Sequence, residues 1–300
     1  MENYRKYLDP RTLAKLQGLE LRARSIVEGY VTGAHKSPFH GFSVEFAEHR
    51  EYVPGDDLRY VDWKAFGKTD RVYLKQYEEE TNLVCYVLLD VSESMTYQSD
   101  DAPLSKLDYA RCVAASLTYL VLQQQDGVGL TTFDREVRAL IRPSTHPTHL
   151  KQLLHAMEIK PSTAKTSMGP IFHDLAERYK KRGVVVVLSD LFDDVGSLMA
   201  GLKHFRHRRH EVILMHVLDP AELDFPFRNM TLFKGLEGLP EQLVDPPSLR
   251  KAYLAEFEAF TKAVRQGCYA RNIDYLQLRT DQPLDLALSK YLAARMNRVK

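Results

Sequence analysis

Three oxygen-bearing side chains follow one apolar run of this sequence at intervals of two residues. Asp90, Ser92 and Ser94 come directly after residues 83–89, a run with the length and composition of a buried strand. Ligands of open α/β sheets bind at the carboxyl ends of the strands. One carboxylate and two hydroxyls at such a place are the hard oxygen ligands that Mg²⁺ or Mn²⁺ prefers. The pattern predicts a divalent-cation site with room for a ligand from outside the chain.

Two further segments supply oxygen ligands that could reach the same place. Asp190 follows the apolar run 184–188, and Thr166 lies in a polar loop before a predicted helix. We expect both side chains near the crevice that Asp90 borders, because the carboxyl ends of parallel strands share one edge of a sheet. The first three residues alone could instead belong to a loop that caps the next helix. The companion residues favour the metal site.

Other acidic residues near these positions have simpler interpretations. Glu93 points away from the set at strand spacing, and we expect it to be solvated. Asp134 is interpreted as a turn residue, with a supporting role at the metal site as the alternative. Asp193 and Asp194 are expected to be solvated loop acids.

An alternation of predicted strands and helices from residue 83 onward positions these side chains. The predicted strands are residues 83–89, 128–133, 136–141, 184–188, 211–218 and 273–278, with a hairpin at 230–233 and 242–244. The predicted helices run from the cap Ser105 to Gly127 and Gly129, over 148–157, 168–181 and 196–207, from the cap Ser248 to Gly267, and over 284–296. This alternation predicts an α/β domain over residues 83–300 with a doubly wound, mostly parallel sheet.

Residues 1–82 have a different character. A helix is predicted at 10–30, and glycine- and proline-containing loops with short strands follow, so we expect a small β- and loop-rich N-terminal subdomain. A Pro54-Gly55 turn precedes five notable residues: Asp56, Asp57, Arg59, Asp62 and Trp63. Arginine–carboxylate pairs and a lone tryptophan favour a structural role that ties this subdomain to the sheet, with a partner-docking surface as the alternative.

Composition limits the possible partners and compartments. The 300 residues carry a formal net charge of +1, which indicates neither nucleic acid nor an anionic membrane. The single dense basic run, 203–210, ends a predicted helix and gives poor support for nucleic-acid binding. Three scattered cysteines suit a reducing compartment, and neither a signal peptide nor a membrane-spanning stretch is evident. We therefore expect a cytoplasmic protein with no membrane span.

The pattern of oxygen ligands resembles the metal-ion-dependent adhesion site of von Willebrand factor A domains. The residues that carry this resemblance are Asp90, Ser92, Ser94, Thr166 and Asp190. The stretch 48–64, with Gly-Asp-Asp-Leu-Arg at 55–59 and Asp-Trp at 62–63, is similar to the signature of a bacterial domain of unknown function that precedes such a module. Segments 208–212 and 279–284 also resemble that family, so the resemblance covers about residues 30–296.

The resemblance has implications for ligands and partners. It implies that Asp90, Ser92 and Ser94 hold the cation directly or through water, that Thr166 joins when a ligand is bound, and that Asp190 acts directly or through water. The cation would be Mg²⁺, Mn²⁺ or Ca²⁺, and an acidic residue of a protein ligand would complete its coordination. Members of the family are often encoded beside MoxR-type AAA+ ATPases, which implies a chaperone-like role with such an ATPase.

These observations lead to one preferred function and two alternatives. We expect a non-enzymatic, cation-dependent interaction module that works as an adaptor with an AAA+ ATPase. The first alternative is a Mg²⁺-dependent hydrolase, such as a phosphatase with Asp90 as nucleophile, although residue 92, where that chemistry needs a second Asp, is Ser. The second alternative is a purely structural metal. The sequence contains neither a GxxxxGK[ST] phosphate loop nor a GxSxG elbow.

Overall fold

The computed structural model describes residues 83–159, 168–235 and 241–284, residues 67 and 72, and the backbone of two strands nearer the N-terminus. Those strands, β1 (Phe46–Glu51) and β2 (Tyr73–Tyr77), form an antiparallel pair. They belong to a compact unit of their own, Pro38–Asn82. Several predictions lie outside the described residues, namely the helix at 10–30, the roles of Asp56, Asp57, Arg59, Asp62 and Trp63, the ligand Thr166 and the helix at 284–296.

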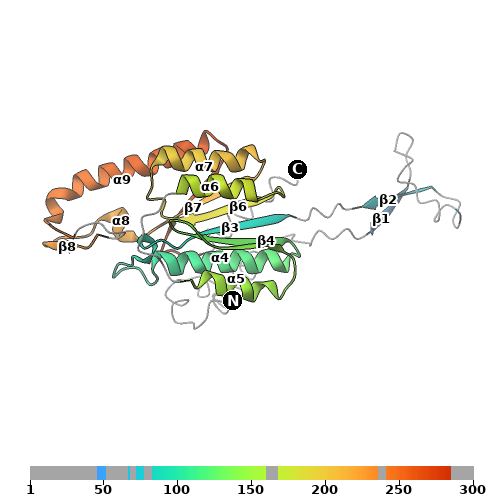
Figure 1. Ribbon diagram of the computed structural model, residues 1–300, viewed down its shortest axis with the longest axis horizontal. Coiled ribbons are helices and arrows are strands. Elements are labelled where there is room, and N and C mark those ends of the chain that lie inside the picture. The colour runs from blue at the N-terminus through green and yellow to red at the C-terminus, as the bar shows by residue number, and fades with distance from the viewer. Residues whose placement is uncertain are drawn as a thin grey trace. The chain divides into compact units, whose positions relative to one another are not determined.

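A six-stranded sheet forms the centre of the other unit (Figure 1). Its strand order is β10-β7-β6-β3-β4-β5, with every neighbouring pair parallel except β4 and the edge strand β5. The strands are β3 (Val84–Asp90), β4 (Gly127–Phe133), β5 (Val137–Ser144), β6 (Val184–Ser189), β7 (Glu211–Leu218) and β10 (Asp274–Arg279). This sheet confirms the predicted mostly parallel α/β fold class.

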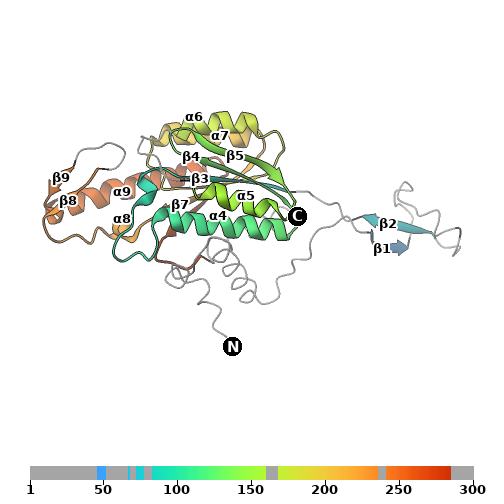
Figure 2. The same ribbon diagram turned by 60° about the horizontal axis from the view of Figure 1, so that its bottom comes forward.

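Helices cover both faces of the sheet (Figures 1 and 2). They are α4 (Lys106–Gln123), α5 (His149–Met157), α6 (Met168–Arg178), α7 (Val195–His207) and α9 (Pro246–Tyr269), with two short helices, η3 (Ser94–Thr96) and α8 (Pro220–Asp224). Successive side chains of a strand point to opposite faces. In β3, Cys85, Val87 and Leu89 therefore join the apolar core under α4 and α5, and the alternate residues join the core under α6 and α7. A strand covered on both faces is continuously apolar, as β3 is.

The start of α4 follows the prediction, and its end does not. Ser105 caps the helix by accepting a hydrogen bond from the Asp108 N–H at 3.0 Å. The helix ends at Gln123, before the predicted end at Gly127 and Gly129, and Gln125 takes a left-handed conformation with a φ of 58°. Gly129 lies inside β4, where a Cβ would come within 2.9 Å of the Ile141 carbonyl oxygen. The glycine serves the close approach of β5.

The predicted limits of α9 were also wrong. Asp245 occupies the N-cap position, and Ser248 lies in the first turn, where its hydroxyl donates to the Asp245 carbonyl. Gly267 lies within the helix, where an added Cβ would come within 2.6 Å of the Met199 sulfur of α7. The predicted hairpin exists as β8 (Thr231–Phe233) paired with β9 (Gln242–Val244). No helix in the described part of the chain combines the length and apolarity needed to cross a bilayer.

Candidate functional site

The carboxyl ends of β3 and β6 carry two buried carboxylates. Asp90 is the last residue of β3, and Asp190 directly follows β6. The strands are parallel neighbours with Leu89 beside Leu188, so both aspartates lie at the same edge of the sheet. Asp90 is 0% exposed and Asp190 1% exposed. Their predicted placement is confirmed.

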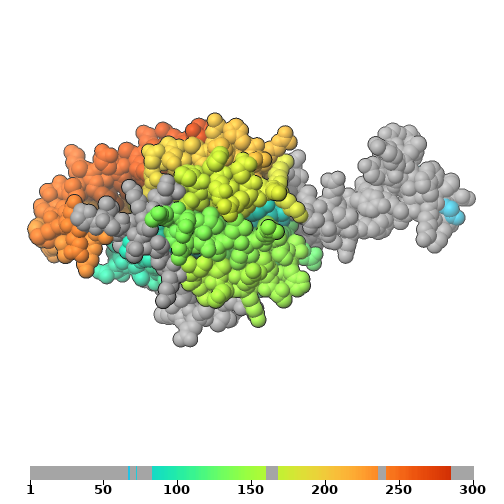
Figure 3. All heavy atoms as spheres, viewed as in Figure 1, coloured from blue at the N-terminus to red at the C-terminus, as the bar shows by residue number. Residues whose placement is uncertain are grey.

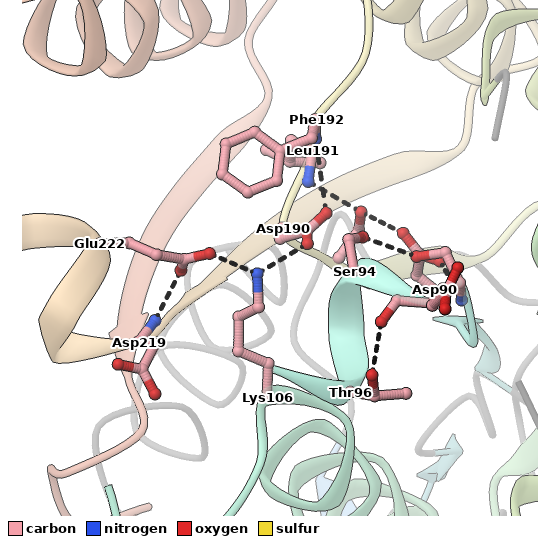
Figure 4. A network of polar contacts seen from close by, with 12 residues as sticks. Asp90, Ser94, Thr96, Lys106, Asp190, Leu191, Phe192, Asp219 and Glu222 are labelled. Carbon is pink, nitrogen blue, oxygen red and sulfur yellow. Dashed lines mark hydrogen bonds and ion pairs between the residues drawn. The ribbon is translucent and has the colours of Figure 1, made fainter. Parts of the chain in front are cut away.

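Ser92 and Ser94 converge with Asp90, as the spacing predicted. Figure 4 shows Ser94 and Asp90 at this strand end. The Ser92 N–H donates to Asp90 Oδ1 at 2.9 Å, and the hydroxyl oxygens of Ser92 and Ser94 are 3.0 Å apart. The short helix η3 begins at Ser94 and turns the chain there. One carboxylate and two hydroxyls therefore share a small volume at the end of β3.

Ser189, which sequence analysis did not select, connects the two strand ends. Its hydroxyl donates to Asp90 Oδ2 at 2.6 Å and accepts from the Leu191 N–H at 2.9 Å. Leu191 has a φ of 60°, a left-handed conformation that is uncommon for a residue with a branched side chain. Such local strain persists where surrounding contacts enforce it, and it is frequent in functional loops.

Lys106 is the most important residue that sequence analysis missed. Its ammonium group lies 2.8 Å from Asp190 Oδ2 and 2.6 Å from Glu222 Oε1 (Figure 4), and the side chain is 1% exposed. Lys106 is the first residue of α4, a position that opposes the helix dipole for a cation. This unfavourable position is visible in the sequence, and it indicates that the lysine makes its stabilising contacts outside its own helix.

Burial and charge set the protonation behaviour of this edge. Burial, followed by the nearby Asp190, raises the pKa of Asp90 to about 7. Burial by itself would lower the pKa of Lys106, but the carboxylates of Asp190 and Glu222 more than offset it and raise that pKa. Burial also raises the pKa of Glu222, despite Lys106. Among the described residues, no ion pair includes Asp90, whereas Asp190 pairs with Lys106, so an ionised Asp90 has no paired cation at the β3 end.

His216 holds the backbone at Asp190. Its Nε2 lies 2.8 Å from the Asp190 carbonyl oxygen, and its Nδ1 lies 2.8 Å from the Tyr275 hydroxyl. Burial lowers the pKa of His216 to about 4, so the imidazole is neutral near pH 7. A carbonyl can only accept, which places the single N–H on Nε2 and makes Nδ1 the acceptor from Tyr275. The β6 end is therefore fixed through both its side chain and its main chain.

The family described as "Protein of unknown function DUF58" matches residues 48–262. The chain belongs to the DUF58 family. Uncharacterized proteins of Mycobacterium tuberculosis and Mycobacterium bovis are each 25% identical to it over 291 residues, which cover 96% of this chain and 90% of each relative. The predicted resemblance to a bacterial domain of unknown function is confirmed, and its association with an ATPase stays a prediction.

Two solved structures are similar to this DUF58 protein. The conserved hypothetical protein BatB from Bacteroides thetaiotaomicron is 14% identical with a TM-score of 0.49, covering 72% of this chain and 99% of that one. The SpRpn10 VWA domain is 12% identical with a TM-score of 0.40, covering 69% of this chain and 94% of that one.

The oxygen atoms at the end of β3 in the DUF58 protein are suitable ligands for a hard divalent cation. Asp90, Ser92 and Ser94 offer oxygen donors, and the buried Asp90 carboxylate is favoured in its ionised form by a nearby cation. Within the described residues, no group of three His, Cys, Asp or Glu side chains could hold a metal. A cation here would therefore depend on serine hydroxyls and on a ligand from outside. Asp190 Oδ2 pairs with Lys106, and its Oδ1 accepts a hydrogen bond from the Phe192 N–H at 3.4 Å.

Four other acids were assigned from sequence, with mixed outcomes. Asp134 is a turn residue as predicted, because its Oδ1 accepts from the Glu136 N–H at 3.1 Å. Glu93, expected to be solvated, is partly buried. Asp193 and Asp194 are not merely solvated: Asp193 accepts from the first N–H of α6 at 2.6 Å, and Asp194 caps α7. Helix starts leave N–H groups that need such acceptors.

Proposed function

We propose that this DUF58 protein is a non-enzymatic protein–protein interaction module that depends on a divalent cation. The proposal depends chiefly on one observation, the contrast in charge compensation at the carboxyl edge. Asp90 is buried with hydroxyl and N–H donors around it, whereas the neighbouring Asp190 already pairs with Lys106. A buried carboxylate without a counter-ion is costly, and a bound cation removes that cost.

Each residue has a role in this proposal. Asp90, Ser92 and Ser94 would hold the cation, and Asp190 and Thr166 would support it directly or through water. The cation, Mg²⁺ with Mn²⁺ or Ca²⁺ as alternatives, would supply a Lewis-acidic centre for one carboxylate of a protein ligand. Since the chain contributes few anionic ligands, an Asp or Glu from a partner gains more by binding.

The geometry disfavours the phosphatase alternative. Both carboxylate oxygens of Asp90 accept hydrogen bonds, one from the Ser92 N–H and one from the Ser189 hydroxyl. Ser92 occupies the position where that chemistry requires a general acid.

The family resemblance supplies the partner in this proposal. We propose a MoxR-type AAA+ ATPase as partner, with the DUF58 protein as an adaptor or co-chaperone in the assembly or activation of target proteins. We propose a reducing compartment such as the cytoplasm, because the three cysteines are buried and none of them forms a disulfide in the described part of the chain.

The direct test of this proposal is a Mn²⁺ titration of the full chain by calorimetry. We expect Asp90→Asn to abolish specific binding. Asp134→Asn is the matched control, because Asp134 is also buried after a neighbouring strand but serves a turn. Equal Mn²⁺ binding by wild type and Asp90→Asn would end the proposal.

A second experiment tests the partner separately. The purified protein and a purified MoxR-type ATPase are mixed with Mg²⁺ or with EDTA and analysed by co-elution. We expect co-elution in Mg²⁺ and its loss in EDTA or with Asp90→Asn. Co-elution that persists both in EDTA and with Asp90→Asn would show that the ATPase contacts another part of the chain.

A further inference from the structure

An aromatic pocket lies directly beside the candidate cation site. It has a volume of about 210 Å³. Six aromatic rings line it, namely Tyr97, Phe192, Phe225, Phe227, Phe233 and Tyr253. They come from the segment after η3, the loop after β6, the segment after α8, the hairpin β8–β9 and α9. In Figures 1 and 2, α8, the hairpin and the start of α9 lie at the carboxyl end of the sheet.

The walls of the pocket are already packed against one another. The ring centroid of Phe225 lies 4.5 Å from that of Tyr253, 5.2 Å from that of Phe227 and 6.0 Å from that of Phe233. These separations are typical of attractive aromatic pairs. In Figure 3 the orange atoms of the hairpin and of the start of α9 lie together at the left of the view. Binding in such a pocket requires little ordering of the protein.

The charged groups in the pocket lining are paired with each other. Lys106 lies between Asp190 and Glu222, and the second oxygen of Glu222 accepts from the Asp219 N–H at 2.8 Å. The ammonium group also lies 5.0 Å from the centroid of the Phe192 ring, as Figure 4 shows. A charged occupant would have to compete with these internal partners. The pocket therefore suits an uncharged, apolar group.

Size and position indicate where that group comes from. Pockets for small molecules measure about 300–1,000 Å³, so this smaller one suits a single large side chain. Ser94 belongs to the candidate cation set and also lines the pocket. Phe192 follows Asp190 by two residues and is 43% exposed. A chain that places a carboxylate at the cation thus has its neighbouring side chains beside the pocket.

We propose that the pocket receives an aromatic or large aliphatic side chain of the protein ligand, close in sequence to the acidic residue that completes the cation site. This inference rests on the proposed function. Ser94 belongs both to the cation set and to the pocket lining, so the two side chains of the ligand lie close together in its sequence. The recognised motif is one Asp or Glu plus one large apolar residue.

The hairpin provides an internal control for this inference. Phe233 lines the pocket, whereas Leu232 is exposed and lies opposite Leu243 in the β8–β9 pair. Neighbouring residues of a strand point to opposite faces. Leu232→Ala therefore alters the same hairpin without altering the pocket, and it matches Phe233→Ala.

The experiment is a peptide-display selection on the full-length protein in Mg²⁺. Each peptide carries a fixed Glu with about three random residues on either side, which span roughly 10 Å in each direction when extended. We expect enrichment of Phe, Tyr, Trp, Leu or Met. Replacing the enriched residue by Ala, or the protein's Phe233 by Ala, should each weaken binding about tenfold or more. Leu232→Ala should change it by less than about threefold.

The outcomes separate this inference from the function on which it rests. Mg²⁺-dependent binding with no preference for apolar residues would contradict the proposed role of the pocket and would still support the cation site. Enrichment of Lys or Arg would overturn it in favour of a cation held among the rings. Absence of any Mg²⁺-dependent binder would overturn both. Because Phe233→Ala could loosen the hairpin, the double-mutant cycle with the Ala-substituted peptide decides: coupling supports the pocket, and additivity refutes it.

Discussion

Two neighbouring strand ends in this protein each bury a carboxylate, but only one of the two carboxylates forms an ion pair. Asp190, after β6, pairs with Lys106, and its main-chain carbonyl is held by His216. Asp90, at the end of β3, receives hydrogen bonds from the Ser92 N–H and the Ser189 hydroxyl. Both carboxylates are almost fully buried. The difference is therefore in charge compensation and not in exposure.

This contrast shows how one sheet edge combines stability with a reactive site. A buried carboxylate with an internal cation is a stable part of the fold, although the pair gains little overall. A buried carboxylate without one raises the free energy of the folded state when ionised, and a bound cation relieves that cost. We expect the ion pair at the β6 end to stabilise the fold whether or not divalent cations are present. We expect the stability contributed by the β3 end to change when a divalent cation binds.

The largest effect should come from removing the internal cation with Lys106→Met. Asp190 and Glu222 would remain buried without a partner, so the free energy of unfolding should fall by about 3–5 kcal/mol. Urea denaturation measures it, with Lys151→Met, an exposed lysine of α5, as control. The variant should also gain more stability from Mg²⁺ than wild type does, since Asp190 becomes free to support the cation. A loss below about 1 kcal/mol would contradict the role assigned to the pair.

His216 should make stability depend on pH at the β6 end. Its pKa is lowered from 6.5 to about 4, so below pH 6.5 the unfolded chain takes up a proton that the folded protein does not. Stability should fall between pH 6.5 and pH 4 by roughly 3 kcal/mol from this group. Urea denaturation at several pH values should show a shallower fall for His216→Gln. Parallel curves for the two proteins would show that the imidazole is not held neutral.

Asp90→Asn, at the β3 end, should raise stability, whereas the two preceding tests concern losses of stability. The pKa of Asp90 is raised to about 7, so without divalent cations its ionisation destabilises the folded protein at pH 8, an effect that fades as the pH falls toward 4. The raised pKa corresponds to roughly 4 kcal/mol, and the amide loses one of the two acceptors that the carboxylate offers to Ser92 and Ser189, so the variant should be more stable than wild type at pH 8 by on the order of 2 kcal/mol. Thermal unfolding with and without Mg²⁺ is the measurement, and Mg²⁺ should stabilise wild type alone. A destabilised variant with an unchanged Mg²⁺ response would favour a structural carboxylate.

The smallest effect should come from Ser189→Ala, which cuts the link between the two ends. The hydroxyl donates to Asp90 and accepts from Leu191, and losing a hydrogen bond to a charged group costs about 1.5 kcal/mol. Ser116→Ala is the control, because that buried hydroxyl donates to the Cys112 carbonyl within α4. Denaturation at pH 8 should separate the two variants. Equal losses would mean that the Asp90 contact adds nothing beyond a neutral hydrogen bond.

Local pattern was sufficient to predict most of the sheet. The continuous apolar runs that form β3 and β6 are visible in the sequence, because a strand covered on both faces has no polar face. The cap at Ser105 is local too, since it joins residues three apart. Gly129 and Gly267 were assigned to helix ends, but Gly129 lies in β4 against the Ile141 carbonyl of β5, and Gly267 lies inside α9 against the Met199 side chain of α7. Such approaches involve residues distant in sequence.

In the candidate site too, the sequence predicted the local contacts and missed those between residues distant in sequence. Spacing after β3 and β6 placed Asp90, Ser92, Ser94 and Asp190 at one edge, because parallel strands end together. The ion pair of Lys106 with Asp190 joins residues 84 positions apart, and its bond to Glu222 joins residues 116 apart. No periodicity encodes those distances. The sequence determined which groups stand at the strand ends, and the tertiary structure decided which carboxylate receives an internal cation, because burial and proximity exist only once the chain is folded.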